Sequence, residues 1–206
     1  MKSDNLLLTF AVIAVIASIL SAGVAYNSLS SFRNLITGFA TDTDTAYVNV
    51  TVESSVDINF TTRDINFETG TIDPGQTAVL TSLGSTTGGT GFTTVTQGFV
   101  LENIGNKDGL LSLMTNKNAD AFIGVSGGAF QYNISALEPS SCDAGAITLG
   151  AWVDVNTTSP GTRVCSNFSY VPDYDTVRID VRLSLPENTP PSAKTAIFTA
   201  TLDDGA

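Results

Sequence analysis

Two cysteines, five asparagines in glycosylation sequons and a few carboxylates are the side chains that could support chemistry, and the sequence contains no histidine. Neither Cys142 nor Cys165 belongs to a CxxC pair. Two thiolates without histidine make a poor zinc site. In a chain exported to an oxidising compartment, two such cysteines form a disulfide. We therefore expect a Cys142–Cys165 disulfide, and two buried free thiols are the alternative.

Five Asn-x-Ser/Thr sequons predict attachment of N-linked glycans. A sugar requires an exposed asparagine, so outward-facing strand positions and turns are the favoured sites. At any single position, an unmodified asparagine is the alternative. The five sites are Asn49, Asn59, Asn133, Asn156 and Asn167.

The tightest carboxylate pairs are Asp173 with Asp175 and Asp203 with Asp204. A paired-carboxylate acid–base site needs both groups in one pocket, so solvated loop and tail charges are the simpler interpretation. The glycine-rich stretch 84–91 lacks the lysine and the following helix of a phosphate-binding loop, and it predicts a flexible turn. We predict a chain that is not an enzyme and binds no metal or cofactor; an anchored surface enzyme that uses an acidic pair is the alternative.

The N-terminal part of the chain is uncharged between Asp4 and Arg33. As an α-helix this run would exceed the ~30 Å hydrocarbon core of a bilayer. The run continues through Phe32, beyond a typical signal-peptide core, so we expect it to be retained rather than cleaved. Small residues at heptad spacing inside it favour close packing against other copies, and a single lipid-exposed span is the alternative. These helix-packing residues are Ala11, Ala14, Ser18, Ser21, Ala25 and Ser28.

The rest of the chain changes to a hydrophobic period of two, which predicts β-strands separated by Gly, Pro and Asn turns. We predict an α+β chain: a long N-terminal hydrophobic helix over 1–38, a neck over 39–45, and an all-β immunoglobulin-like sandwich over 46–206. The neck aspartates Asp42 and Asp44 are too few to bind a cation. The main predicted strands are 46–53, 56–60, 65–67, 76–82, 92–102, 110–115, 119–125, 130–134, 147–155, 163–171, 175–185 and 194–202.

The formal net charge of the chain is −11. A surface this acidic repels nucleic acid, and no basic stripe is present in the sequence. We interpret the acidity as a source of solubility and predict no nucleic-acid partner.

A hydrophobic N-terminal helix, a short neck and a β head resemble the archaeal type IV pilin-like and archaellin-like filament subunits. Phe99–Asn106 with Leu110–Leu113, and later Leu185–Lys194, also resemble hairpins of archaeal surface immunoglobulin-like domains. The resemblance implies a homopolymer in which helices form the core of an extracellular filament and glycosylated heads lie outside, with the subunit in the membrane before assembly. Family members lose a basic leader before the helix, whereas Lys2 is the only basic residue before Asp4 here. A membrane-anchored cell-surface binding or S-layer-like module is the alternative.

Overall fold

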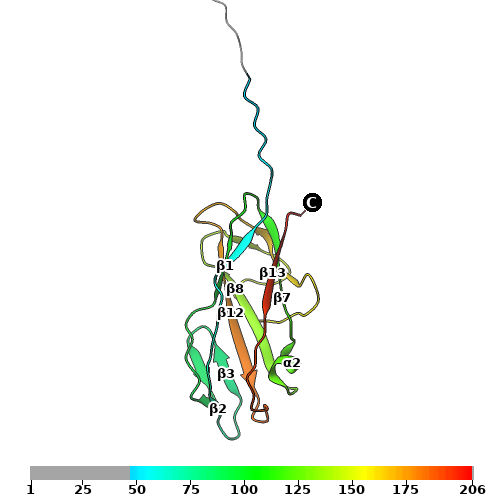
Figure 1. The fold of residues 1–206 in the computed structure, drawn as a ribbon. Helices are drawn as coiled ribbons and strands as arrows, with labels where there is room; N and C mark the ends of the chain where they lie inside the picture. The colour runs from blue at the N-terminus through cyan, green and yellow to red at the C-terminus, as the bar shows by residue number, and fades with distance from the viewer. Residues whose placement is uncertain (1–46, 206) are drawn as a thin grey trace, which may run out of the picture. The chain divides into compact units, whose positions relative to one another are not determined.

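The computed structural model describes residues 47–205, and residues 52–205 contain a two-sheet β-sandwich (Figure 1). The compact β unit begins at Val52. A seven-stranded sheet contains β1, β3, β4, β6, β8, β10 and β12, a four-stranded sheet contains β7, β9, β11 and β13, and β2 pairs with β5. The elements are β1 (Ile58–Thr62), β2 (Thr71–Ile72), β3 (Ala78–Thr81), β4 (Ser85–Thr87), β5 (Gly89–Thr90), β6 (Phe99–Asn103), β7 (Gly109–Thr115), α2 (Ala119–Ile123), β8 (Ala129–Ala136), β9 (Cys142–Ala144), β10 (Val153–Asp154), β11 (Thr162–Phe168), β12 (Thr176–Leu185) and β13 (Phe198–Asp203).

Strand β12 is the centre of the larger sheet. Its alternating apolar residues, from Val177 to Leu185, are buried as the period of two predicts. One side of β12 pairs with β8 over residues 177–184. The other side pairs first with β6, over residues 176–179, and then with β3, over residues 182–185. The strand therefore exchanges one partner for another near its middle.

Two buried clusters form the core. The first lies between the two sheets and includes Leu101, Leu113, Ile134, Phe168 and Ile179. The second lies on the other half of the larger sheet, where α2 and the segments before β6 cover residues such as Leu80, Phe130 and Leu183. The ring of Phe198 lies 5.7 Å from that of Phe130 and 6.2 Å from that of Tyr132, so it contacts both clusters.

The predicted α+β class is wrong. Residues 47–205 are mostly β, and the one helix among them is the five-residue α2. The predicted long helix over 1–38 and the neck over 39–45 lie outside the described residues. An apolar run does not by itself decide fold class, whereas the alternating strands of the described residues give a mostly β fold.

Several predicted strands are also wrong. Residues 119–125 contain α2, because Asn118 accepts a 2.9 Å hydrogen bond from the Ala121 N–H as an N-cap and Gly124 closes the helix with φ 88°. A short apolar run does not distinguish a strand from a buried helical turn. Residues 47–53 are exposed and form no strand. Conversely, the glycine-rich stretch 84–91 contains strands β4 and β5 rather than a loose turn.

The two hairpins implied by the family resemblance are instead connections between sheets. Strand β6 belongs to the larger sheet and β7 to the smaller one, and the same is true of β12 and β13. Buried Asn103 fixes the first connection, since its Nδ2 donates to the carbonyls of Lys107 and Phe168, both at 3.1 Å, and its Oδ1 accepts from the Gly105 N–H. The Asn103 side chain thus ties the turn to β11 of the opposite sheet.

Candidate functional site

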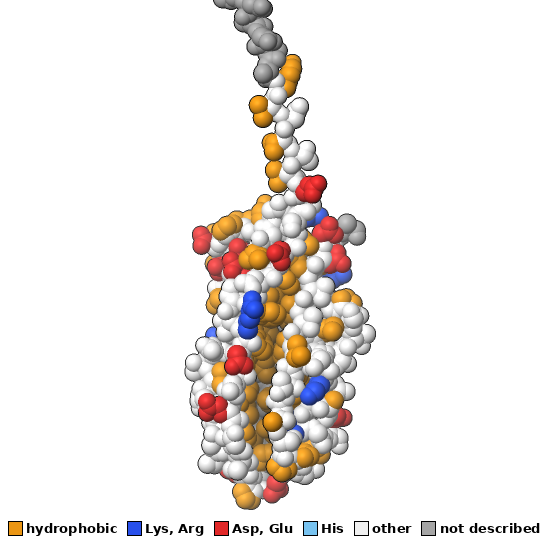
Figure 2. Space-filling view, in the orientation of Figure 1, with side chains coloured by type: hydrophobic (Ala, Val, Ile, Leu, Met, Phe, Trp, Pro, Cys, Tyr) orange, Lys and Arg blue, Asp and Glu red, His pale blue; other side chains and the backbone are white. Residues whose placement is uncertain are grey.

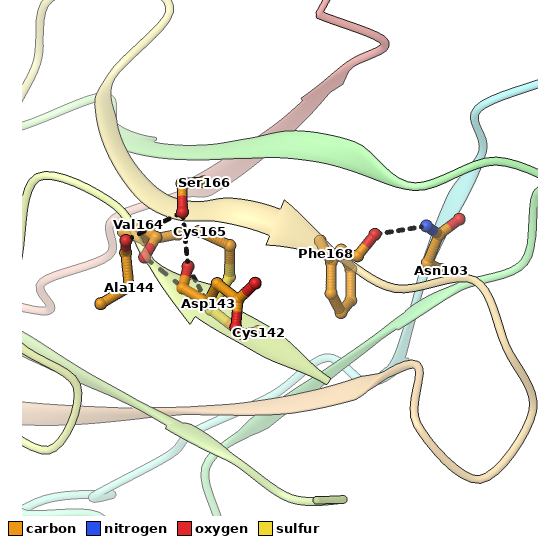
Figure 3. The surroundings of a disulfide bond; sticks show 8 residues. All are labelled: Asn103, Cys142, Asp143, Ala144, Val164, Cys165, Ser166 and Phe168. Carbon is orange, nitrogen blue, oxygen red and sulfur yellow. Dashed lines mark hydrogen bonds between the residues drawn. A yellow bond between two sulfur atoms is a disulfide. The ribbon is translucent and has the colours of Figure 1, made fainter. Parts of the chain in front are cut away.

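The predicted disulfide is confirmed. Cys142 and Cys165 are bonded, with their Cα atoms 5.3 Å apart, so the free-thiol alternative is excluded. The bond joins neighbouring strands β9 and β11 of the smaller sheet (Figure 3). Immunoglobulin domains instead place their conserved disulfide between the two sheets. Here the bond secures an outer strand of one sheet, and both cysteines are buried.

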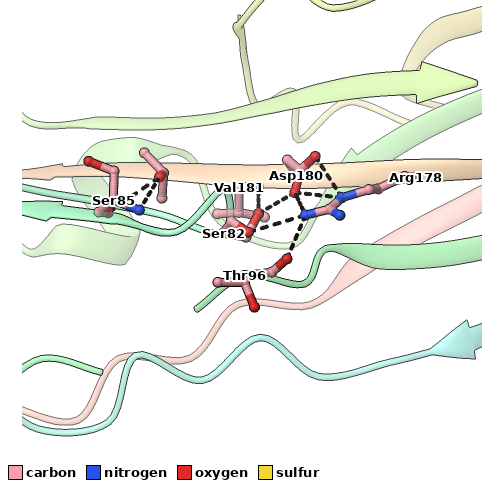
Figure 4. A network of polar contacts seen from close by, with 7 residues as sticks. Ser82, Ser85, Thr96, Arg178, Asp180 and Val181 are labelled. Atoms are coloured by element: carbon pink, nitrogen blue, oxygen red, sulfur yellow. Dashed lines mark hydrogen bonds and ion pairs between the residues drawn. The ribbon is translucent and has the colours of Figure 1, made fainter. Parts of the chain in front are cut away.

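A buried polar network lies where β12 changes partner from β6 to β3 (Figure 4). The carboxylate of Asp180, which is 3% exposed, accepts hydrogen bonds of 2.8–3.0 Å from Nε and Nη2 of Arg178. It also accepts a 2.6 Å hydrogen bond from the Ser82 hydroxyl. Arg178 donates further to the carbonyls of Ser82 and Thr96. The network satisfies backbone groups that lack a ladder partner at this junction, which is a structural role.

Gly98 allows the chain to pass close to this network. A Cβ at position 98 would lie 2.5 Å from the Ile179 carbonyl oxygen and 2.8 Å from Oδ1 of Asp180. Neither atom can move without breaking the ladder or the ion pair. A side chain larger than hydrogen is therefore excluded at this position.

The five sequons fall into two groups. Asn133 donates through Nδ2 to the Gly150 carbonyl at 2.9 Å, and Asn156 donates to the Thr162 hydroxyl at 3.4 Å. An N-linked glycan attaches through that same nitrogen, so these two side chains are engaged in the fold. Asn49 is exposed, while Asn59 and Asn167 are half-buried strand residues whose Nδ2 atoms have no hydrogen-bond partner among the described residues.

The acidic pairs have separate surroundings. Asp175 is 7% exposed, and burial, followed by the nearby charge of Glu138, raises the pKa of its carboxyl. Asp173 is exposed, Asp203 accepts from the Gly205 N–H, and Asp204 lies 3.4 Å from the Lys107 ammonium. Within residues 47–205 no three His, Cys, Asp or Glu side chains converge in an arrangement suited to a metal ion.

The predicted helix-packing residues, Ala11, Ala14, Ser18, Ser21, Ala25 and Ser28, lie outside the described residues, as do Asp42 and Asp44. In the described part of the chain, no helix has the length and apolar character needed to cross a bilayer. The packing stripe remains a pattern of the sequence.

An apolar groove of about 440 Å³ opens between β1 and β13, the edge strands of the two sheets. Phe60 of β1, Phe99 of β6 and Phe198 of β13 line it. The ring of Phe99 lies 6.0 Å from that of Phe60 and 5.3 Å from that of Phe198. Figure 2 shows a band of hydrophobic side chains along this face, between the two sheet edges. The groove thus exposes part of the core.

Polar chemistry at the groove comes chiefly from Arg63. Its Nε donates to the Phe60 carbonyl at 2.6 Å and its Nη2 donates to Oδ1 of Asn59 at 2.6 Å. The guanidinium therefore covers part of the outer edge of β1. The groove combines aromatic walls with an open strand edge, an arrangement that suits an extended apolar peptide.

Comparisons with protein-family models, with curated proteins and with solved structures give no match to this chain.

The sequence predicted the disulfide but not the groove or the Arg178–Asp180 pair. The predicted strand 194–202 includes Phe198, yet no local pattern shows that this strand is the last of a sheet. Asp180 occupies a position that alternation assigns to the outer face of β12. Ser82 donates to Asp180, and the Thr96 carbonyl accepts from its ion-pair partner Arg178; both residues are distant from β12 in sequence.

Proposed function

We propose that this protein is a structural subunit of an extracellular filament, in which the β-sandwich is displayed outside and the uncharged N-terminal run holds the subunit in the membrane or the polymer. The observation that carries the proposal is the combination of a disulfide-stabilised β domain with an apolar run that has no charge between Asp4 and Arg33. Disulfides persist in oxidising, extracytoplasmic compartments. Apolar runs of this length avoid water.

Three of the five sequons are the expected sites of N-linked glycans. Asn49 is exposed, and Asn59 and Asn167 keep their amide nitrogens free of hydrogen bonds among the described residues. We expect glycans at these positions and not at Asn133, whose Nδ2 is bonded to Gly150. Mass spectrometry of peptides from the native protein measures the occupancy of each site.

The filament proposal is tested by shearing cells that produce the full chain and imaging the released material by negative-stain microscopy with antibodies to the β domain. We expect labelled filaments. Ile16→Lys, inside the apolar run, should abolish them, because a charge opposes transfer of the run out of water. Thr43→Lys, outside the run, is the matched control and should leave them intact.

Retention of the whole protein in the membrane fraction, with no labelled filament, would contradict the proposal. That result would favour an anchored surface module that stays unassembled. Filaments that form equally well from both variants would show that the apolar run has no part in assembly.

A further inference from the structure

We propose that the groove between β1 and β13 binds residues 47–52 of a second copy of the chain, which add to β13 as a fifth strand of the smaller sheet. The inference rests on the proposed function, since it names the contact through which neighbouring β domains join. The same molecule has an unpaired strand-like segment and an open apolar groove.

The donor is the segment Tyr47-Val-Asn-Val-Thr-Val52. Its residues are β-branched or aromatic at most positions and alternate in polarity, a pattern that favours a half-buried strand. Yet it forms no strand, and its apolar side chains are highly exposed: Tyr47 is 85% exposed, Val48 94%, Val50 83% and Val52 78%. A run of exposed apolar residues of this kind marks a surface that another element covers.

The acceptor is the outer edge of β13. This strand pairs with β7 on one side and is the last strand of its sheet. Open strand edges are templates for pairing with another chain. By contrast, Arg63 already covers the carbonyl of Phe60 on the facing edge of β1. The strand added to β13 therefore meets an edge that no side chain caps in the described structure.

The side-chain pattern of the donor matches the groove. Because successive residues of a strand face opposite ways, Val48, Val50 and Val52 share one face. That face enters the groove and packs on Phe60, Phe99 and Phe198. Asn49 and Thr51 then point to solvent, so a glycan at Asn49 remains compatible with the added strand.

The donor comes from another copy because the chain following it is fixed. The Asn106 side chain donates to the Glu53 carbonyl at 2.9 Å and accepts from the Ser55 N–H at 2.6 Å. The backbone N–H of Asn106 donates to the Ser55 carbonyl, and that of Ile104 donates to the Asp57 carbonyl. Residues 53–57 thus continue the line of β1 alongside 104–106. Folding 47–52 back into the groove of its own chain requires a reversal within these residues and loss of those bonds.

The test is photo-crosslinking of the full chain in detergent. A benzoylphenylalanine at position 50 and, separately, at position 49 is introduced into ¹⁵N-labelled chain, which is mixed with unlabelled chain, irradiated and analysed by mass spectrometry. We expect links from position 50 to peptides containing Phe60 or Phe198, with donor and acceptor carrying different isotopes. Position 49, on the other face, should give at most about a tenth of that yield.

Two pairs of variants sharpen the test. Val48→Asp should reduce the cross-link yield from position 50 at least about tenfold, while Thr51→Asp leaves it unchanged, because only the first places a charge in an apolar groove. Ile197→Asp in the acceptor, at a groove residue 59% exposed, should have the same effect. Leu83→Asp, at a comparably exposed residue outside the groove lining, is its control.

No link to groove residues, links confined to a single isotope, or equal yields from positions 49 and 50 would each overturn the proposal. The failures remain distinguishable. Labelled filaments on cells without these cross-links would leave the structural-subunit proposal standing and reject the added strand. Cross-links in purified chain without filaments on cells would reject the filament and keep the strand contact.

Discussion

The larger and smaller sheets face each other along two long edges of the sandwich. One of these edges is covered by a chain segment and the other is open. At one edge the segment 145–150 bonds to both sheets: Gly145 and Ala146 donate to β11, and Gly150 donates to β8. Ile147 and Leu149 on this segment cover the core, and the disulfide lies beside it. At the other edge, β1 and β13 leave a groove open to Phe60, Phe99 and Phe198. The chain thus closes one edge with its own residues and leaves the other edge open among the described residues.

The largest contrast is expected between two phenylalanines of the core. Phe168 is fully buried, whereas Phe198 is half-buried at the groove. Phe168→Ala should lower the free energy of unfolding by about 4 kcal/mol, and Phe198→Ala by about 2 kcal/mol, because less apolar surface is lost at the open edge. Urea unfolding followed by fluorescence of Trp152, the single tryptophan, measures both. Equal losses at low protein concentration would contradict the contrast.

Removal of the disulfide tests the closed edge alone. Replacing Cys142 and Cys165 together with alanine should cost about 3 kcal/mol, because the bond closes a loop with a sequence separation of 23 residues in the unfolded chain. The photo-crosslink at the groove should survive under conditions where the variant stays folded. A loss below about 1 kcal/mol would show that the segment 145–150 holds this edge without the bond.

Two arginines extend the comparison to the surface. Arg182 lies 4.8 Å above the Trp152 ring and bonds to the Gln131 amide oxygen, next to the closed edge. Arg63 is exposed beside the groove. We expect Arg182→Ala to lower the free energy of unfolding by about 1.5 kcal/mol and Arg63→Ala by at most about 0.5 kcal/mol. Thermal or urea unfolding of the two variants side by side gives the difference, and the reverse order would be inconsistent with it.

The smallest effect concerns pH. Because burial raises the pKa of Asp175 in the folded state, the folded chain holds this proton more tightly than the unfolded chain does. The contribution of Asp175 to stability is therefore greatest below its unfolded value of 3.8 and is lost as pH rises through the folded pKa. Asp175→Asn should remove this decline and raise stability at pH 7 relative to wild type, whereas exposed Asp173→Asn should not. Unfolding curves at pH 3 to 7 measure it.

Features set by residues close together in the sequence could be predicted, whereas features set by residues far apart in the sequence could not. The alternation from Val177 to Leu185 fixes β12 because one strand face is buried along its whole length. The chain has two cysteines, which allow one intramolecular pairing, so the partners of the disulfide could be predicted from the sequence. Asn118 and Gly124 are the cap signals of α2, but an apolar run this short also fits a strand, and the strand predicted over 119–125 was wrong.

Sheet membership was not predictable in the same way. A turn such as Ile104–Asp108 looks alike whether the next strand pairs with the last one or crosses to the other sheet. The deciding contact is between Asn103 and the Phe168 carbonyl, which are 65 residues apart. The groove follows from sheet membership, since β1 and β13 become edges only once every other strand has its neighbours.

The burial of both sulfurs has a consequence for how the protein meets a reductant. Thiol–disulfide exchange requires an incoming thiolate to reach a sulfur atom, and Cys165 is 0% exposed and Cys142 5% exposed. Attack therefore requires strand β9 to detach. The rate at which glutathione or dithiothreitol reduces the disulfide of the native chain then measures the rate of that detachment. The folded chain therefore keeps its bond through passing changes in redox conditions.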